Sequence, residues 1–141
     1  MTKPATLRAG LHHEFSYAVP LERTVPHLFP EAPEFAPMPE VLATGYLVGL
    51  LEWTCIQLIN PHIDWPREQS VGTHIAVSHE AATPPGLTVT ASVRLVEVAG
   101  RRLEFEVSAH DGADTIARGT HQRHLITTDR FITRATAKSP S

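Results

Sequence analysis

The run from Val41 to Ile59 (VLATGYLVGLLEWTCIQLI) contains one formal charge, the carboxylate of Glu52. Its length falls within the roughly 17–25 residues that can cross a bilayer. Glu52 and Gln57 interrupt the run, however, and neither flank carries a basic anchor. We therefore predict a buried helix with no membrane contact, beginning near Glu40 and ending at Asn60–Pro61, where proline prevents continuation.

The single carboxylate of this helix can be interpreted in two ways. On an arbitrary amphipathic helix, Glu52 would mark the side exposed to water. Buried among apolar side chains, its charge would be costly unless another group compensated it. Such a carboxylate is a candidate for acid–base or nucleophilic chemistry. Which interpretation holds depends on what surrounds the helix.

The whole chain is consistent with one domain, residues 1–141, with a core of about residues 11–128. The net charge of −3 gives no support for a nucleic-acid-binding surface, which would need clustered Lys and Arg. One cysteine, Cys55, cannot form an intrachain disulfide, and MTKPATLRAG does not resemble a signal peptide. A reducing, cytoplasmic location is expected.

Strand patterns surround the predicted helix. Alternating residues predict strands over Leu11–Val19, Val71–His79, Leu87–Val98, Leu103–Ala109 and Thr115–Thr127. One face of the second strand should carry Thr73, Ile75, Val77 and His79. Residues 61–70 are expected to form a loop, and about residues 129–141 a frayed tail.

This order of elements predicts an α+β protein. One flat sheet would cover a helix on one side only, whereas this helix is apolar on nearly every side. An antiparallel sheet curled around one long central helix, the hotdog fold, satisfies that requirement. Such a sheet has an exposed edge strand, which a second copy can cover by pairing edge to edge. We expect at least a homodimer.

Residues 20–39 are rich in proline. They are too proline-rich for a long helix or a central strand. They also hold Leu28, Phe29, Phe35 and Met38, which makes them too apolar for a disordered linker. The segment is either a folded flap over another part of the molecule or a plain surface connection.

Thr44 and Gly45 lie at or just before the start of the helix. Free backbone N–H groups and the positive end of the helix dipole could hold a developing oxyanion there. Glu52, eight residues on, would lie about 12 Å further along a straight helix. The two side chains can therefore share a site only if Thr44 folds back before the helix or if a dimer interface completes the site.

Other polar residues are ambiguous on their own. His79 ends a strand on an apolar face, where a histidine is more often a core residue than a catalyst. Gly72 is expected at a bulge or a close ligand approach, and Arg123 alone would be interpreted as a surface charge. His121 and His124 should point to opposite faces of a strand, so no metal site is expected.

Taken together, these segments resemble the fluoroacetyl-CoA thioesterase family of small hotdog hydrolases. The segments that carry the resemblance are TVPHLFPEAPEFAPMPEVLATGYLVGLLEW, GTHIAVSHEAATPPGLTVTASV, GRRLEFEVSAHDG and GTHQRH. The resemblance implies a homodimer that cleaves short acyl-CoA thioesters without a cofactor. It places the catalytic set on Thr44 in ATGY, Glu52 in LLEW and His79 in VSHEAATPPG. It places substrate-binding roles on Gly72 in VGT and Arg123 in HQRH.

The family's apolar lid corresponds to the proline-rich segment, including Val25, Leu28 and Phe35. Where the family has a gating phenylalanine, this chain has Met38, which is flexible and fixes no shape. The resemblance therefore predicts thioester hydrolysis and leaves the preference for fluoroacetyl over acetyl open. A general short-chain thioesterase and a module that binds acyl-CoA without cleaving it are the alternatives.

Overall fold

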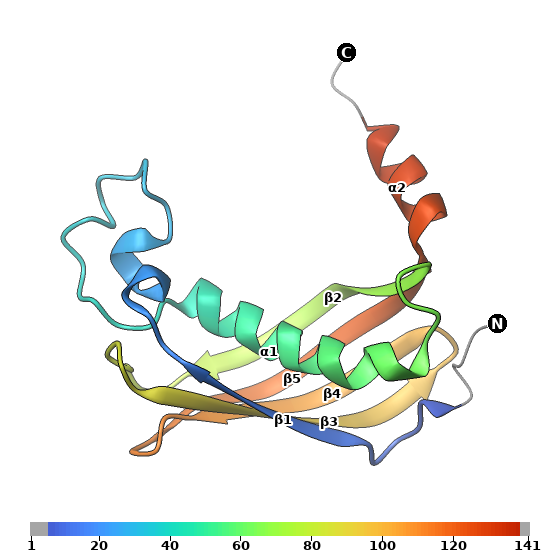
Figure 1. Cartoon of the computed structure of the whole chain (residues 1–141), viewed down its shortest axis with the longest axis horizontal. Coiled ribbons are helices and arrows are strands. Elements are labelled where there is room, and N and C mark those ends of the chain that lie inside the picture. The colour runs from blue at the N-terminus through green and yellow to red at the C-terminus, as the bar shows by residue number, and fades with distance from the viewer. Residues whose placement is uncertain (1–5, 139–141) are drawn as a thin grey trace.

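The computed structural model describes residues 6–138. In that range one antiparallel sheet has the strand order β1-β3-β4-β5-β2 (Figure 1). The strands are β1 (His12–Ala18), β2 (Glu68–His79), β3 (Thr88–Ala99), β4 (Arg102–His110) and β5 (Thr115–Thr127). The helices are α1 (Thr44–Ile59) and α2 (Thr128–Thr136), with short 3-10 turns at Leu21–Arg23, Val25–His27 and Asn60–His62.

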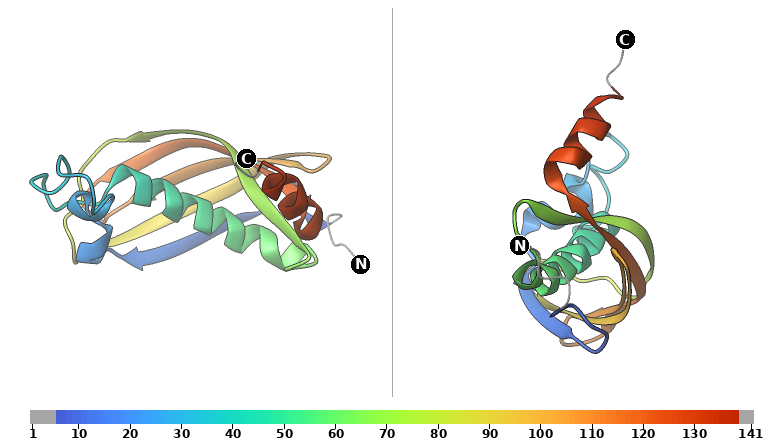
Figure 2. Two further views of the ribbon diagram at one scale, coloured as in Figure 1. Left: turned by 90° about the horizontal axis from the view of Figure 1, so that it is seen from above. Right: turned by 90° about the vertical axis from the view of Figure 1, so that its right-hand side faces the viewer.

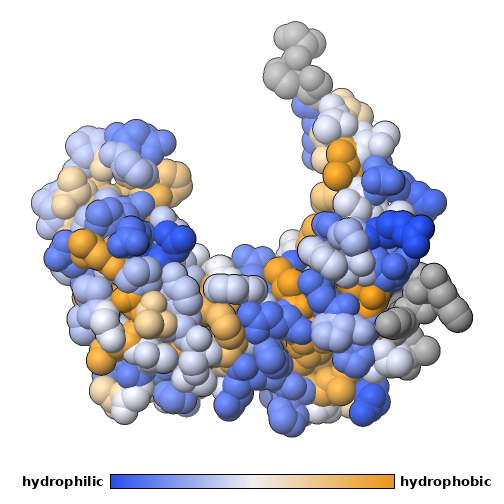
Figure 3. Space-filling model, in the orientation of Figure 1, coloured by the Kyte–Doolittle hydropathy of each residue, from blue (hydrophilic) through white to orange (hydrophobic). Residues whose placement is uncertain are grey.

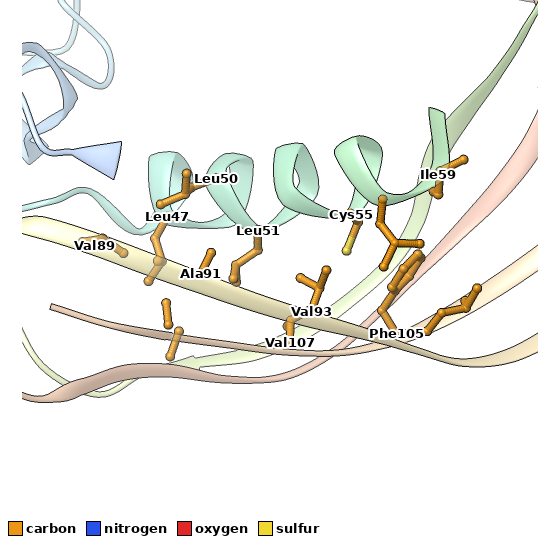
Figure 4. Packing of buried hydrophobic residues seen from close by; sticks show 14 of the residues in the cluster. Leu47, Leu50, Leu51, Cys55, Ile59, Val89, Ala91, Val93, Phe105 and Val107 are labelled. Carbon is orange, nitrogen blue, oxygen red and sulfur yellow. The ribbon is translucent and has the colours of Figure 1, made fainter. Parts of the chain in front are cut away.

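Helix α1 lies in the hollow of the curled sheet (Figure 2), which confirms the predicted hotdog arrangement. Its inward side chains meet the inner face of the central strands β3 and β4 (Figure 4). Those strands bury Val89, Ala91, Val93, Leu95, Leu103, Phe105, Val107 and Ala109, as their alternation predicts. Burial of this apolar surface is the main stabilising contribution and holds α1 along the sheet.

The helix starts later than predicted, at Thr44 rather than near Glu40. The residues before it are extended: Leu42 forms a bridge with Thr24, and its N–H donates to the Thr83 carbonyl (2.8 Å). These backbone bonds prevent residues 41–43 from joining the helix, although their side chains are apolar. As a result, Thr44 is the first residue of α1.

The expectation that the sheet leaves α1 little exposed surface is wrong for a single chain. Gly45 and Gly49 are exposed, and Trp53 keeps 46% of its surface accessible. Trp53 packs edge-on against Phe15 (4.6 Å between ring centroids) and Tyr17 of β1. The sheet therefore covers most of the helix and leaves one stripe open.

Residues 20–39, called the flap below, are folded. Tyr46 Oη donates to the His27 carbonyl (3.3 Å), and the Arg23 guanidinium lies 5.0 Å from the Tyr46 ring centre. Further out, the rings of Phe29 and Phe35 stack with centroids 5.9 Å apart. The base of the flap is thus held against the start of α1.

The predicted frayed tail is wrong for the residues that the structure describes. Residues Thr128–Thr136 form helix α2, and residues 139–141 lie outside the described range. Two hydrogen bonds of Thr128 fix the start of this helix: its N–H donates to the Arg67 carbonyl, and its Oγ1 donates to the Pro66 carbonyl. Strand β2 also begins at Glu68, inside the predicted loop 61–70. In residues 6–138 no helix is long and apolar enough to cross a membrane.

Candidate active site

Thr44 and His79 are in direct contact. The first residue of α1 and the last of β2 are joined by a 2.7 Å hydrogen bond between Thr44 Oγ1 and His79 Nδ1. The other ring nitrogen, His79 Nε2, is buried and has no hydrogen-bond partner in the described part of the chain. Orphaned buried polar atoms are rare, so this nitrogen is available to a group outside the chain.

Glu52 is paired with Arg123. Arg123 Nη1 donates to Glu52 Oε1 at 3.0 Å. The arginine side chain is 4% exposed and the glutamate side chain 38%. Arg123 is therefore not the surface charge that its position alone suggests. Glu52 is half-buried, so it is neither a fully water-exposed residue of an amphipathic helix nor a fully buried charge. A buried guanidinium compensates its charge, as the apolar surroundings require.

Two further residues hold Arg123 in position, and the sequence interpretation gave neither a role. Arg123 Nε donates to Ser70 Oγ (2.8 Å) and Nη2 to the Ser70 carbonyl (2.9 Å). His121 Nε2 accepts from Arg123 Nη1 (3.1 Å), while His121 Nδ1 donates to the His74 carbonyl (2.7 Å). Burial lowers the pKa of His121, consistent with a neutral ring in these roles. The spacing of His121 and Arg123 on β5 was a usable signal, because alternate residues share a face.

Gly72 lies directly beside this pair because β2 carries a bulge. The register shifts between Gly72 and His74, so Gly72 pairs with Arg123 and Ile75 with His121. A Cβ on Gly72 would lie 2.8 Å from Glu52 Oε1. The bulge breaks the predicted alternation, in which Thr73 would share a face with Ile75. The absent side chain leaves room for a cleft of about 340 Å³ lined by Val48, Glu52, Gly72, Thr73, His74, Ile75 and His121.

The structure divides the predicted site residues into two groups. Glu52, Gly72 and Arg123 form one group, and Thr44 and His79 form the other. Within one chain the groups are separated by about 12 Å along the helix axis, and by roughly 20 Å along β2. One chain therefore does not bring Glu52 and His79 together.

The flap residues named from the sequence lie near the Thr44 group. A Leu28 methyl group is 3.3 Å from where a Cβ on Gly45 would be. The Val25 N–H donates to the Val41 carbonyl, just before the helix. Phe35 stacks on its flap neighbour, and Met38 is 43% exposed. Of these four, Leu28 reaches the first turn of α1.

The remaining candidates for chemistry are few. Among residues 6–138, no group of three or more His, Cys, Asp or Glu side chains is arranged to hold a metal ion. The Cys55 thiol is buried in the core, and burial raises its pKa to about 12. A thiol in that state is a poor nucleophile. Glu52 and His79 thus remain the candidates for a reaction.

Comparison with known proteins gives a consistent result. Residues 28–129 match the family model of the fluoroacetyl-CoA-specific thioesterase. A fluoroacetyl-CoA thioesterase of Streptantibioticus cattleyicolor is 50% identical over 135 residues, 96% of each chain. A solved fluoroacetyl-CoA thioesterase structure is 50% identical, with 95% of this chain and 98% of that chain covered and a TM-score of 0.92.

A variant of that enzyme solved in complex with fluoroacetate and CoA is 52% identical. The alignment covers 89% of this chain and 99% of that chain, with a TM-score of 0.86. The likeness extends from the flap through β5 in unbroken order and includes both groups of site residues. The chain belongs to the fluoroacetyl-CoA-specific thioesterase family.

Proposed function

We propose that this protein hydrolyses short acyl-CoA thioesters, fluoroacetyl-CoA among them, to the free acid and coenzyme A. The observation that carries the proposal is the Glu52 carboxylate, held by a buried arginine at the mouth of a cleft beside Gly72. Membership of the family supports the substrate class, since a relative was solved with fluoroacetate and CoA. The reaction uses side chains and water, with no cofactor.

The working unit is a homodimer in which two chains complete each site. Strand β2 is a sheet edge, and Gly72–Ala76 along it are exposed. A second β2 pairing there in antiparallel fashion lies about 4.8 Å away. A register centred between Ile75 and Ala76 sets Gly72 opposite the partner's His79. Glu52 of one chain then faces the Thr44–His79 pair of the other.

Each group then has a defined role in the reaction. The Glu52 carboxylate either attacks the thioester carbonyl carbon or takes a proton from the attacking water. The thiolate of coenzyme A leaves and takes a proton from the protonated imidazole of the partner's His79, whose orientation is set by the hydrogen bond with Thr44. The imidazole regains its proton from the attacking water, directly or through Glu52. If an acyl-glutamate forms, water cleaves it and restores the carboxylate.

The first turn of α1 supplies the oxyanion site. No side chain caps this helix, whose N-cap is Ala43. Its first backbone N–H groups are therefore free to donate to the oxygen of the tetrahedral intermediate. Gly45 has no side chain to obstruct that approach, and Leu28 of the flap covers it. The flap is thus proposed as a lid over this end of the site.

Met38 favours a site without strict selectivity for fluorine. A flexible thioether at an exposed lid position fixes no pocket shape. A general short-chain thioesterase is therefore the second candidate function. The variant Met38→Phe should raise the ratio of kcat/KM for fluoroacetyl-CoA to that for acetyl-CoA about tenfold. An unchanged ratio would show that this position does not set selectivity.

Gly72 should tolerate no side chain in an active enzyme. In Gly72→Ala, the new Cβ would displace Glu52 Oε1, which lies 2.8 Å from that point. We expect kcat to fall about tenfold to a hundredfold, because small misplacements of a reacting group are costly. The thermal midpoint should change little, since the flexible end of Glu52 can move. Retained kcat would mean that Glu52 acts from another position.

The proposed function is tested by release of free thiol, followed colorimetrically, with acetyl-, fluoroacetyl-, propionyl- and butyryl-CoA. Turnover of the two-carbon substrates, falling with chain length, is the expected result. Binding of these thioesters without thiol release would establish a non-catalytic acyl-CoA-binding module instead. We further propose a cytoplasmic location, supported by the single reduced thiol of Cys55.

A further inference from the structure

The flap and helix α2 lie beside opposite ends of α1 and project toward the same side of the molecule. They form the two arms of the U-shaped outline in Figure 3. Both arms expose large apolar side chains: Phe29 (53%) and Met38 (43%) on the flap, Phe131 (41%) and Ile132 (52%) on α2. Exposed apolar side chains gathered on projecting segments indicate an interaction surface.

Helix α2 is short and largely exposed. It has nine residues, none of them buried. A helix this short is marginal in water without a packed face. Thr128 holds its first turn: the N–H donates to the Arg67 carbonyl and Oγ1 donates to the Pro66 carbonyl. A cleft of about 560 Å³ separates the rest of the helix from β2 and β5. Its apolar side chains, Phe131 and Ile132, are therefore open to contact from outside the single chain.

The two arms carry opposite charges. Helix α2 and the residues after it have Arg130, Arg134 and Lys138, while the exposed flap has Glu31 and Glu34. Among residues 6–138 none of these five side chains forms an ion pair, although ion pairs are common elsewhere on the surface. An acidic apolar surface and a basic apolar surface are complementary.

We propose that α2 of each subunit packs on the flap of the other. This inference rests on the dimer of the proposed function. There, the register that sets Gly72 opposite the partner's His79 also carries the start of β2, at Glu68, past the end of the partner's β2, toward the segment that leads to the partner's Thr83. Thr83 binds Leu42 at the flap base, and Glu68 pairs with Thr127, the residue before α2. Each α2 therefore lies at the partner's flap.

The consequence is a site closed by two segments from different chains. The subunit that contributes Glu52 also contributes the helix that rests on the lid of that site. Flap order then depends on dimer assembly, and α2 becomes part of the acyl-CoA gate. The family match ends at residue 129, so this helix lies almost wholly outside the matched region.

Cross-linking between subunits tests the contact. Met38→Cys chains and Ile132→Cys chains, carrying different tags, are mixed, allowed to exchange subunits and treated with a short bismaleimide. The native thiol does not compete, because Cys55 is buried and burial raises its pKa to about 12. We expect a covalent heterodimer. The matched control mixes Ile132→Cys with Ser16→Cys on β1, the opposite sheet edge, and should give none.

The outcomes separate this inference from the proposed function. If the unmodified protein is a dimer by light scattering and releases thiol, but the dimeric cysteine variants form no cross-link, α2 does not cover the flap and this inference is wrong. A monomer, or equal cross-linking of the control, overturns it as well. Loss of thioester hydrolysis in the unmodified protein would instead overturn the proposed function.

Charge reversal supplies an independent measurement. The double variant Arg130→Glu and Arg134→Glu, added to the Ile132→Cys chain, should lower the cross-link yield at low salt by about two- to fivefold per pair. Reversing Glu31 and Glu34 to Arg in the Met38→Cys chain should restore it. If neither set of charge reversals changes the cross-link yield, the proposed charge pairing is wrong.

Discussion

The variant Glu52→Gln is expected to lower kcat for acetyl-CoA hydrolysis about 10²- to 10⁴-fold, a loss of about 3–5 kcal/mol of transition-state stabilisation. In the unchanged protein, Arg123 Nη1 lies 3.0 Å from Glu52 Oε1. Glutamine fits the same space, and its Oε1 can still accept this hydrogen bond. The substitution therefore removes the negative charge and the basic oxygen with little change in packing. Binding of coenzyme A, measured by calorimetry, should persist.

The matched control is Glu106→Gln. Glu106 is also a carboxylate bonded to an arginine, with Glu106 Oε1 2.6 Å from Arg94 Nη2, but both side chains are more than half exposed. This control should retain full activity, because an exposed pair contributes little. Near-wild-type hydrolysis by Glu52→Gln, with thermal unfolding intact, would eliminate Glu52 as the reacting carboxylate. It would leave His79 as the remaining candidate.

Alternation in the sequence was sufficient to predict which residues of the central strands face the core. Phe105 on β4 and Val93 on β3 are buried as expected, because the side-chain period of a strand is a local property. The location of α1 followed from its apolar length for the same reason. Features that depend on one segment alone were predictable in this chain.

Features that depend on contacts between distant segments could not be predicted from the sequence. The first turn predicted near Glu40 is lost because residues 41–43 form backbone hydrogen bonds with Arg23, Val25 and Thr83 instead. The bulge after Gly72 sets which β2 side chains point inward, and its exact place has no local signal beyond the glycine. Helix α2 was missed because it has only nine residues and buries none of them, so it leaves no core-facing pattern in the sequence.

The candidate site also divides into local features that the sequence revealed and contacts between distant residues that it did not. Glu52 was identifiable as an unusual charge in an apolar run, yet its partner Arg123 is 71 residues away and looked like a surface residue. The sequence also raised the possibility of a site shared between chains, from the 12 Å that eight helical residues span. The contacts of Thr44 with His79 and of Glu52 with Arg123 define the two halves on which the proposed pairing between chains rests.

Two inactive variants should restore each other when they share a dimer. If Glu52 of one chain acts with the partner's His79, a heterodimer of Glu52→Gln and His79→Ala chains has one site with both changes and one site with neither. Heterodimers isolated through two different tags should then show about half the wild-type rate. Each parent homodimer carries a change in both of its sites, so the gain over either parent should be large.

The structure provides a control with the opposite expectation. Thr44 and His79 are bonded to each other within one chain, so they belong to the same half of the site. A heterodimer of Thr44→Ala and His79→Ala chains has a defect in both sites and should regain nothing. A heterodimer of Glu52→Gln and Thr44→Ala chains should regain about half the wild-type rate. If no Glu52 pairing restores activity in a verified heterodimer, Glu52 and His79 do not act across the interface. The β2 register proposed above would then be wrong.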